Sequence, residues 1–250
     1  MCSRMKPGTF LVAAIAMAIA GAGCPGAAAE PYNAPPCPQT ATEINPPARQ
    51  SHPNCQLHAN GLAFDVFYFT VPEAPGPQAV KVTVTDGSGA VVQKIDELLE
   101  PSSPSGVGLQ DLDGDGRVEL IIPIAQHVFN GSPNTRFSVW RAAGDSLHFE
   151  RTQMVGQAVY PGGDGYVVVN GGSPNSRDLN FYLPTGAGFT FVAALTIEAQ
   201  QLDQGRVLAA TCRARQGDGL QVADVDVAAA QDTFCGSAAA RAIWPGAQRV

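Results

Sequence analysis

The fold class is decided by the segment Val80-Lys81-Val82-Thr83-Val84-Thr85-Asp86-Gly87-Ser88-Gly89-Ala90-Val91-Val92-Gln93-Lys94-Ile95. Its first half alternates apolar and polar residues, and a period of two is typical of a β-strand with one buried face. The pair Asp86-Gly87 then favours the tight turn of a β-hairpin. The segment therefore predicts two antiparallel strands joined by a short turn.

Further β-forming runs cover most of the chain. Phe64–Val71 precedes the hairpin, and later strands are predicted at Val118–Ile124, Arg136–Arg141, Leu147–Arg151, Tyr166–Asn170, Asn180–Leu183, Phe189–Ile197, Arg206–Cys212 and Leu220–Val227. Short helices are expected only at Asp96–Glu100 and in the last fifteen residues. The 27 Gly and 20 Pro supply turns, and only 15% of the residues are charged. This combination predicts an all-β protein.

An internal repeat follows the hairpin. The hexapeptide Gly131–Arg136 recurs forty-one residues later as Gly172–Arg177, and each copy leads into a strand with aromatic residues. Gly-Asp-Gly turns lie at Gly114–Gly116, Gly163–Gly165 and Gly217–Gly219. These turns are 49 and 54 residues apart, at or just above the length of a propeller blade. We expect a propeller-like or partial-propeller array of antiparallel β-repeats. The alternative is that Gly-Asp-Gly recurs only because it suits hairpin turns.

One loop carries a metal-binding pattern. Residues 111–119 read D-x-D-x-D-G-x-x-E, and carboxylates at alternate positions of a curled loop form an oxygen cage that suits Ca²⁺. The predicted ligands are the side chains of Asp111, Asp113 and Asp115, the carbonyl of Arg117 and the carboxylate of Glu119.

The position of this loop excludes an EF-hand. The twelfth position of an EF-hand loop requires a bidentate Glu, but here it is Ile122, inside an apolar run. The loop is instead expected to enter a strand, with a structural calcium ion. An acidic turn without an ion is the alternative, although three neighbouring aspartates repel one another. The second and third Gly-Asp-Gly turns lack the partner carboxylates.

The aspartate loop and its strand resemble the calcium loops of FG-GAP/VCBS-type repeats, known from integrin α-chain propellers and secreted bacterial proteins. From Val82 to Phe149 the chain is similar to a bacterial family of exported propeller-like proteins, through Gln93-Lys94-Ile95, the aspartate loop and Gly131–Asn134. Some members of that family bind and inhibit lysozyme-like cell-wall hydrolases. The resemblance implies a protein partner, while Glu119 departs from the usual Asp.

The N-terminal residues 1–29 are expected to be a signal peptide. Arg4 and Lys6 precede the apolar run Phe10–Ala20, which is too short for a bilayer that needs about 20 residues. Cleavage before Cys24, which would then carry a lipid, and cleavage after Ala29 are both open; a cytosolic N-terminal helix is the alternative. Residues 30–56 are predicted to be a Pro-rich tether and residues 57–250 the β-repeat domain.

The cysteine count supports export to the periplasm, the envelope or the medium. Of six Cys, Cys2 and Cys24 are removed or lipidated, which leaves an even number. The pairs Cys37–Cys55 and Cys212–Cys235 are the simplest connectivity. A zinc site is the alternative, but the chain has no Cys-x-x-Cys or paired His spacing.

The charge excludes one class of partner and favours another. With 15 Lys+Arg, 22 Asp+Glu and no basic block, nucleic acid is not expected to bind. Loss of Arg4 and Lys6 changes the net charge to −7 − 2 = −9, which favours a cationic protein such as a basic cell-wall hydrolase.

No catalytic residue is expected, since the chain has no G-x-S-x-G motif. A hydrolase remains a rival because a fold can bring together carboxylates such as Asp65, Asp178 and Asp203. The alternative binding function is a glycan-binding or adhesion module that uses Trp140 and Tyr182, although both aromatic residues suit a core position.

Overall fold

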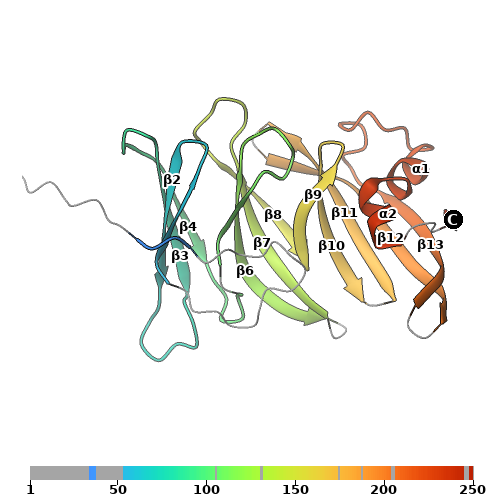
Figure 1. Cartoon of the computed structure of the whole chain (residues 1–250), viewed down its shortest axis with the longest axis horizontal. Coiled ribbons are helices and arrows are strands. Elements are labelled where there is room, and N and C mark those ends of the chain that lie inside the picture. Colours follow the sequence, from blue (N-terminus) through green and yellow to red (C-terminus); the bar gives the residue numbers. More distant parts are fainter. Residues whose placement is uncertain are drawn as a thin grey trace, which may run out of the picture. The chain divides into compact units, whose positions relative to one another are not determined.

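The computed structural model describes residues 34–37, 53–104, 106–129, 132–173, 175–186, 188–203, 206–244 and 248–249. The predicted signal peptide and Cys24 lie outside these residues, as does most of the Pro-rich segment. The described part is all-β, as predicted, and its strands form three sheets that do not close into a barrel (Figure 1).

Sheet A is a meander of four antiparallel strands: β1 (Cys55–Ala59), β2 (Leu62–Phe69), β3 (Ala79–Thr85) and β4 (Val91–Leu98). The predicted hairpin is β3–β4, and its turn is held by Asp86, whose Oδ1 accepts the N–H groups of Ser88 at 2.8 Å and Ala90 at 3.1 Å. The predicted helix at Asp96–Glu100 is wrong, because β4 continues through Asp96, which pairs with Lys81 across the sheet.

Sheet B is a second four-stranded antiparallel meander, composed of β5 (Gly108–Gln110), β6 (Glu119–Phe129), β7 (Ser132–Arg141) and β8 (Glu150–Gly156). The last strand begins later than the predicted Leu147–Arg151 because the chain first makes a turn in which Ser146 donates its N–H to the carbonyl of Ala143. Leu147 is exposed in that turn.

Sheet C contains β9 (Ala158–Gly163), β10 (Tyr166–Ser173), β11 (Ser176–Thr185), β12 (Gly188–Asp203), β13 (Arg206–Gln216) and the short parallel strand β14 (Gln248–Arg249). Two short helices follow β13: α1 (Ala230–Cys235) and α2 (Ala238–Ile243). The predicted strand Leu220–Val227 is wrong. Gly219 donates its N–H to the carbonyl of Phe191 at 3.1 Å, and the chain there turns back across sheet C.

The sequence repeat occupies matching hairpins of sheets B and C. The first two Gly-Asp-Gly turns join the first and second strands of their sheets, and the described residues of the two hexapeptides lie where the third strand begins, with residues 132–136 in β7 and residues 176–177 in β11. The third turn, Gly217–Gly219, follows β13 and leads into no strand. The hexapeptide repeat is therefore structural, whereas the third Gly-Asp-Gly is a local turn.

Three buried clusters join the layers. Between sheets A and B lie residues such as Phe64, Val82, Leu120 and Ile122. Sheets B and C share a cluster with Ile121, Val139, Met154, Val167 and Val169. The opposite face of sheet C packs against the helices through Leu179, Phe181, Leu195 and Phe234. Sheet B is thus covered on both faces, because alternate residues of its strands enter different clusters.

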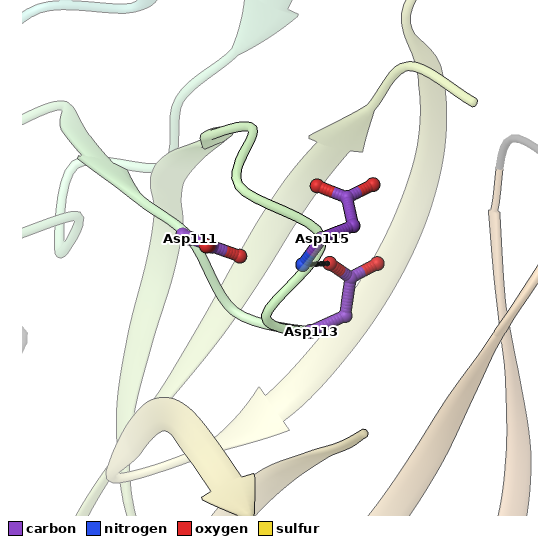
Figure 2. A group of neighbouring side chains, drawn as sticks. All are labelled: Asp111, Asp113 and Asp115. Carbon is purple, nitrogen blue, oxygen red and sulfur yellow. Dashed lines mark hydrogen bonds between the residues drawn. The ribbon is translucent and has the colours of Figure 1, made fainter. Parts of the chain in front are cut away.

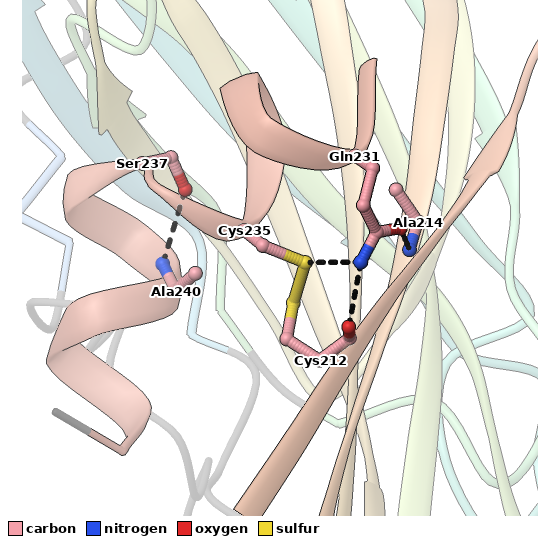
Figure 3. The surroundings of a disulfide bond; sticks show 6 residues. All are labelled: Cys212, Ala214, Gln231, Cys235, Ser237 and Ala240. Atoms are coloured by element: carbon pink, nitrogen blue, oxygen red, sulfur yellow. Dashed lines mark hydrogen bonds between the residues drawn. A yellow bond between two sulfur atoms is a disulfide. The ribbon is translucent and has the colours of Figure 1, made fainter. Parts of the chain in front are cut away.

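The two predicted disulfides are present. Cys37–Cys55 ties the described part of the Pro-rich segment to β1, where Pro36 also forms a bridge with Gln56, so the fold extends beyond the predicted boundary at Leu57. Cys212–Cys235 connects β13 to α1 (Figure 3). Two disulfides favour an oxidising, exported compartment. None of the described helices is long and apolar enough to cross a membrane.

Candidate metal centre

The structure brings the three predicted aspartates together in the loop between β5 and β6. Asp111, Asp113 and Asp115 each offer one carboxylate oxygen, and these oxygens lie within 4.8 Å of one another (Figure 2). Hard oxygen donors at this spacing fit a calcium ion. The predicted convergence of the carboxylates is therefore confirmed, and the identity of an ion stays a prediction.

The loop is shaped by its own aspartates. The carboxylate of Asp111 accepts the N–H groups of Gly114 at 2.8 Å and Gly116 at 3.0 Å. Asp113 accepts the N–H of Asp115 at 3.1 Å, as Figure 2 shows. Gly116 has a positive φ of +85°, which residues with a side chain adopt only with strain. These bonds curl the chain so that the carboxylates face one centre.

A fixed cation, Arg141 at the end of β7, lies against this loop. Its Nε donates to Asp113 Oδ2 at 2.6 Å, and its Nη2 donates to Asp115 Oδ2 at 3.1 Å. The Arg141 side chain is only 8% exposed and the Asp113 side chain 1%. Sequence spacing gave no sign of this contact, because Arg141 follows the loop by a whole hairpin.

Arg141 reduces the net negative charge at the aspartate loop. Three aspartates and one guanidinium leave −3 + 1 = −2 at the centre. The repulsion between the aspartates is therefore reduced by the protein itself but not cancelled. A divalent cation would balance the remaining charge.

Glu119 lies behind the loop. Its Oε2 accepts the N–H of Leu112 at 2.7 Å, and its Oε1 is 4.0 Å from the Nε of Arg141. The side chain is 1% exposed, and burial, together with the smaller effect of the neighbouring Asp113 and Asp115 charges, raises its pKa to about 8. Glu119 is not part of the cluster of three carboxylates. In this structure it fixes the loop backbone, and its role as a ligand stays a prediction.

The loop also contacts neighbouring turns. Asn60, between β1 and β2, donates its side-chain amide to the carbonyl of Gly116 at 3.0 Å and accepts the N–H of Val118 at 3.0 Å. Arg117 donates its guanidinium to the carbonyls of Gly144 and Ser146 in the turn between β7 and β8. Arg141 in addition donates to the carbonyl of Gly186, between β11 and β12, at 2.7 Å. The loop therefore contacts turns of sheets A and B directly, and Arg141 links it to a turn of sheet C.

The two aromatic residues considered for glycan binding serve the core. Trp140 packs against the cluster between sheets A and B, and its indole N–H donates to Glu97 at 3.1 Å. Tyr182 packs against the cluster between sheets B and C, 5.6 Å from the ring of Phe191. Burial raises the pKa of Tyr182. Both side chains are partly buried against these clusters.

No protein-family model matches the chain, and no curated protein matches it. Among solved structures, "Structure of a Xanthomonas Type IV Secretion System related protein" is similar at 15% sequence identity with a TM-score of 0.43. The match covers 69% of this chain and 94% of that chain. We draw nothing about function from a likeness of this size.

Proposed function

We propose that the chain is an exported, non-enzymatic, calcium-binding β-repeat protein that acts as a binding module for another protein. The observation that carries the calcium part is the centre formed by Asp111, Asp113 and Asp115, whose net charge with Arg141 is −2. Because the loop contacts turns of sheets A and B and is linked to sheet C through Arg141, the ion would stabilise their arrangement and take no part in chemistry.

The strand order of the three sheets supports the proposal that the scaffold is propeller-like. Each begins with four consecutive antiparallel strands, and successive sheets bury a shared apolar cluster. In this proposal each meander is one blade of a partial propeller, and sheet C carries extra strands. A rigid array of this kind presents loops at its ends, where recognition commonly occurs.

The proposed partner is a basic cell-wall hydrolase, which the protein would inhibit. The full chain carries a net charge of −7, and an acidic surface accelerates encounter with a cationic protein. Two disulfides agree with a location outside the cytoplasm, where such hydrolases act. An enzyme is the rival class.

The calcium site is tested by thermal unfolding with calcium and with EDTA. Calcium binds the folded loop better than the unfolded chain, so it should raise the melting temperature of the wild type. Asp113→Ala should melt earlier and show no calcium dependence. The matched control is Asp218→Ala, in the third Gly-Asp-Gly turn, which should respond to calcium like the wild type. A wild-type curve that EDTA leaves unchanged would refute the site.

The partner is tested by affinity capture from envelope extract, with and without calcium, followed by a hydrolase assay. Recovery of a basic hydrolase whose activity falls on addition of the protein supports inhibition. Retention on cell-wall polysaccharide without any hydrolase contradicts it. Turnover of a peptidoglycan, glycan, ester or peptide substrate by the protein itself would overturn the non-enzymatic assignment.

A further inference from the structure

One face of sheet C carries a set of polar side chains, interrupted by Ala194 between Asn180 and Arg215, which we name the polar face. Residues paired across antiparallel strands point to the same side of a sheet. The register therefore aligns Asp178, Thr196 and Arg213 in one row. The adjacent rows complete the polar face with Ser176, Glu198, Thr211, Asn180 and Arg215. The intervening residues, such as Leu179, Leu195 and Cys212, are buried on the opposite face against the helices.

Two depressions lie on the polar face. The first, of about 320 Å³, is lined by Thr196, Glu198, Thr211, Arg213 and Arg215. The second, also about 320 Å³, lies toward sheet B and is lined by Asn134, Val155, Gly156, residues 171–173, Ser176, Asp178 and Asn180. The two meet where Thr196 donates its hydroxyl to Asp178 at 2.9 Å. Each volume falls within the range of small-ligand sites.

Arg213 and Arg215 are the distinctive groups of the first depression. Both are exposed, and neither guanidinium forms an ion pair with any residue that the structure describes. Two residues along a strand span roughly 6.6 Å, so both positive charges face the same space. Guanidinium groups bind carboxylates through paired, charge-assisted hydrogen bonds. An anion at this position would satisfy both arginines.

The backbone that carries Arg213 is held in place from the other side of the sheet. Its neighbour Cys212 forms the disulfide with Cys235 of α1. Gln231 of α1 donates its amide to the carbonyl of Cys212 at 2.7 Å and accepts the N–H of Ala214 at 2.7 Å (Figure 3). Arg213 thus lies between two anchored residues, and such pre-organisation lowers the entropy cost of binding.

We propose that the polar face binds a saccharide that carries a single carboxylate, with the carboxylate on Arg213 and Arg215. The amide, hydroxyl and carboxylate groups of the second depression, among them Asn134, Asn180 and Asp178, supply donors and acceptors for sugar hydroxyls. A polyanion is disfavoured because Glu198 lines the same depression and the whole chain is acidic. This site is separate from the aspartate loop and does not depend on the proposed protein partner.

The test is a titration of the full chain with cellobiouronic acid, a disaccharide with one carboxylate, followed by NMR chemical shifts and calorimetry. Binding should shift the amides of β11 to β13. The methyl ester of the same disaccharide should bind at least tenfold more weakly, since it loses a charge-assisted contact. The double variant Arg213→Gln/Arg215→Gln should show a similar loss, whereas the control Lys94→Gln/Arg241→Gln removes equal charge elsewhere and should bind like the wild type.

A second variant tests the saccharide half of the site. A Cβ added at Gly171 would contact only Asn134 Oδ1, at 3.7 Å, so the side chain of Gly171→Leu would start from an open position and extend into the second depression. It should weaken binding of the disaccharide and leave the melting temperature unchanged. Equal affinity for acid and ester, or equal binding of inorganic phosphate and oligogalacturonate, would refute the proposal, as would shifts confined to other strands or no binding at all.

Discussion

Removal of the guanidinium of Arg141 tests the charge balance of the aspartate loop. The change is Arg141→Gln, which takes one cation from a pair with Asp113 whose side chains are 8% and 1% exposed. Breaking a buried ion pair by removing one partner costs about 3–5 kcal/mol. The contact with Asp115, which is 30% exposed, adds little because solvent screens it. At about 2–4 °C per kcal/mol for a domain of this size, the melting temperature in EDTA should fall on the order of 10 °C.

Calcium should reduce this loss, because a divalent cation supplies the charge that the variant lacks. The assay is thermal unfolding of wild type and variant, each in EDTA and in calcium. The matched control is Arg117→Gln, which removes the same charge from the loop itself, where the guanidinium contacts only backbone carbonyls. If the two variants melt at the same temperature in EDTA, or if calcium stabilises Arg141→Gln no more than the wild type, the assigned role of Arg141 is wrong.

Two further predictions concern stability. Replacing both Cys212 and Cys235 by Ser should lower the free energy of unfolding by about 3 kcal/mol, since the disulfide closes a loop with a sequence separation of 23. Urea titration measures this change, and an unchanged unfolding midpoint would contradict the prediction. In EDTA, wild-type stability should decrease as the pH rises from 4.5 toward 8, because the unfolded Glu119 releases its proton while burial keeps its folded pKa at about 8. Glu119→Gln should lack that decrease, and parallel pH curves of the two proteins would refute the assignment.

Local sequence patterns were sufficient for most strands and for the aspartates. Alternation identifies β3, and Asp86 makes the turn bonds expected of it. The carboxylates of the loop converge because their positions alternate within a few residues. Local patterns failed at Asp96, where pairing with Lys81 extends a strand, and at Leu220, which is buried in a turn. In both places tertiary contacts outweighed local preference.

Contacts between sheets could not be predicted from spacing. Glu97 of β4 is 7% exposed and binds Arg151 of β8 with Nε to Oε1 at 2.6 Å, and it also accepts the indole N–H of Trp140. In the sequence, each of these residues fits an ordinary position in a strand. The same holds for Arg141, whose carboxylate partners lie on the other side of a hairpin. Such pairs depend on how the sheets stack, and one sequence carries no local signal of that stacking.

The positions of the aspartate loop in sheet B and of the polar face in sheet C decide how calcium and the saccharide should influence each other. The aspartate loop is linked to sheet C through Arg141, which donates to the carbonyl of Gly186 next to the end of β11 at Thr185, whereas the polar face begins at the other end of that strand with Ser176. The polar face is held by strand pairing, the disulfide and Gln231, none of which involves the loop. Below its unfolding temperature, the protein in EDTA should therefore bind the disaccharide with the affinity it has in calcium. Loss of binding in EDTA while the chain is still folded would instead show that the loop controls the polar face through β11.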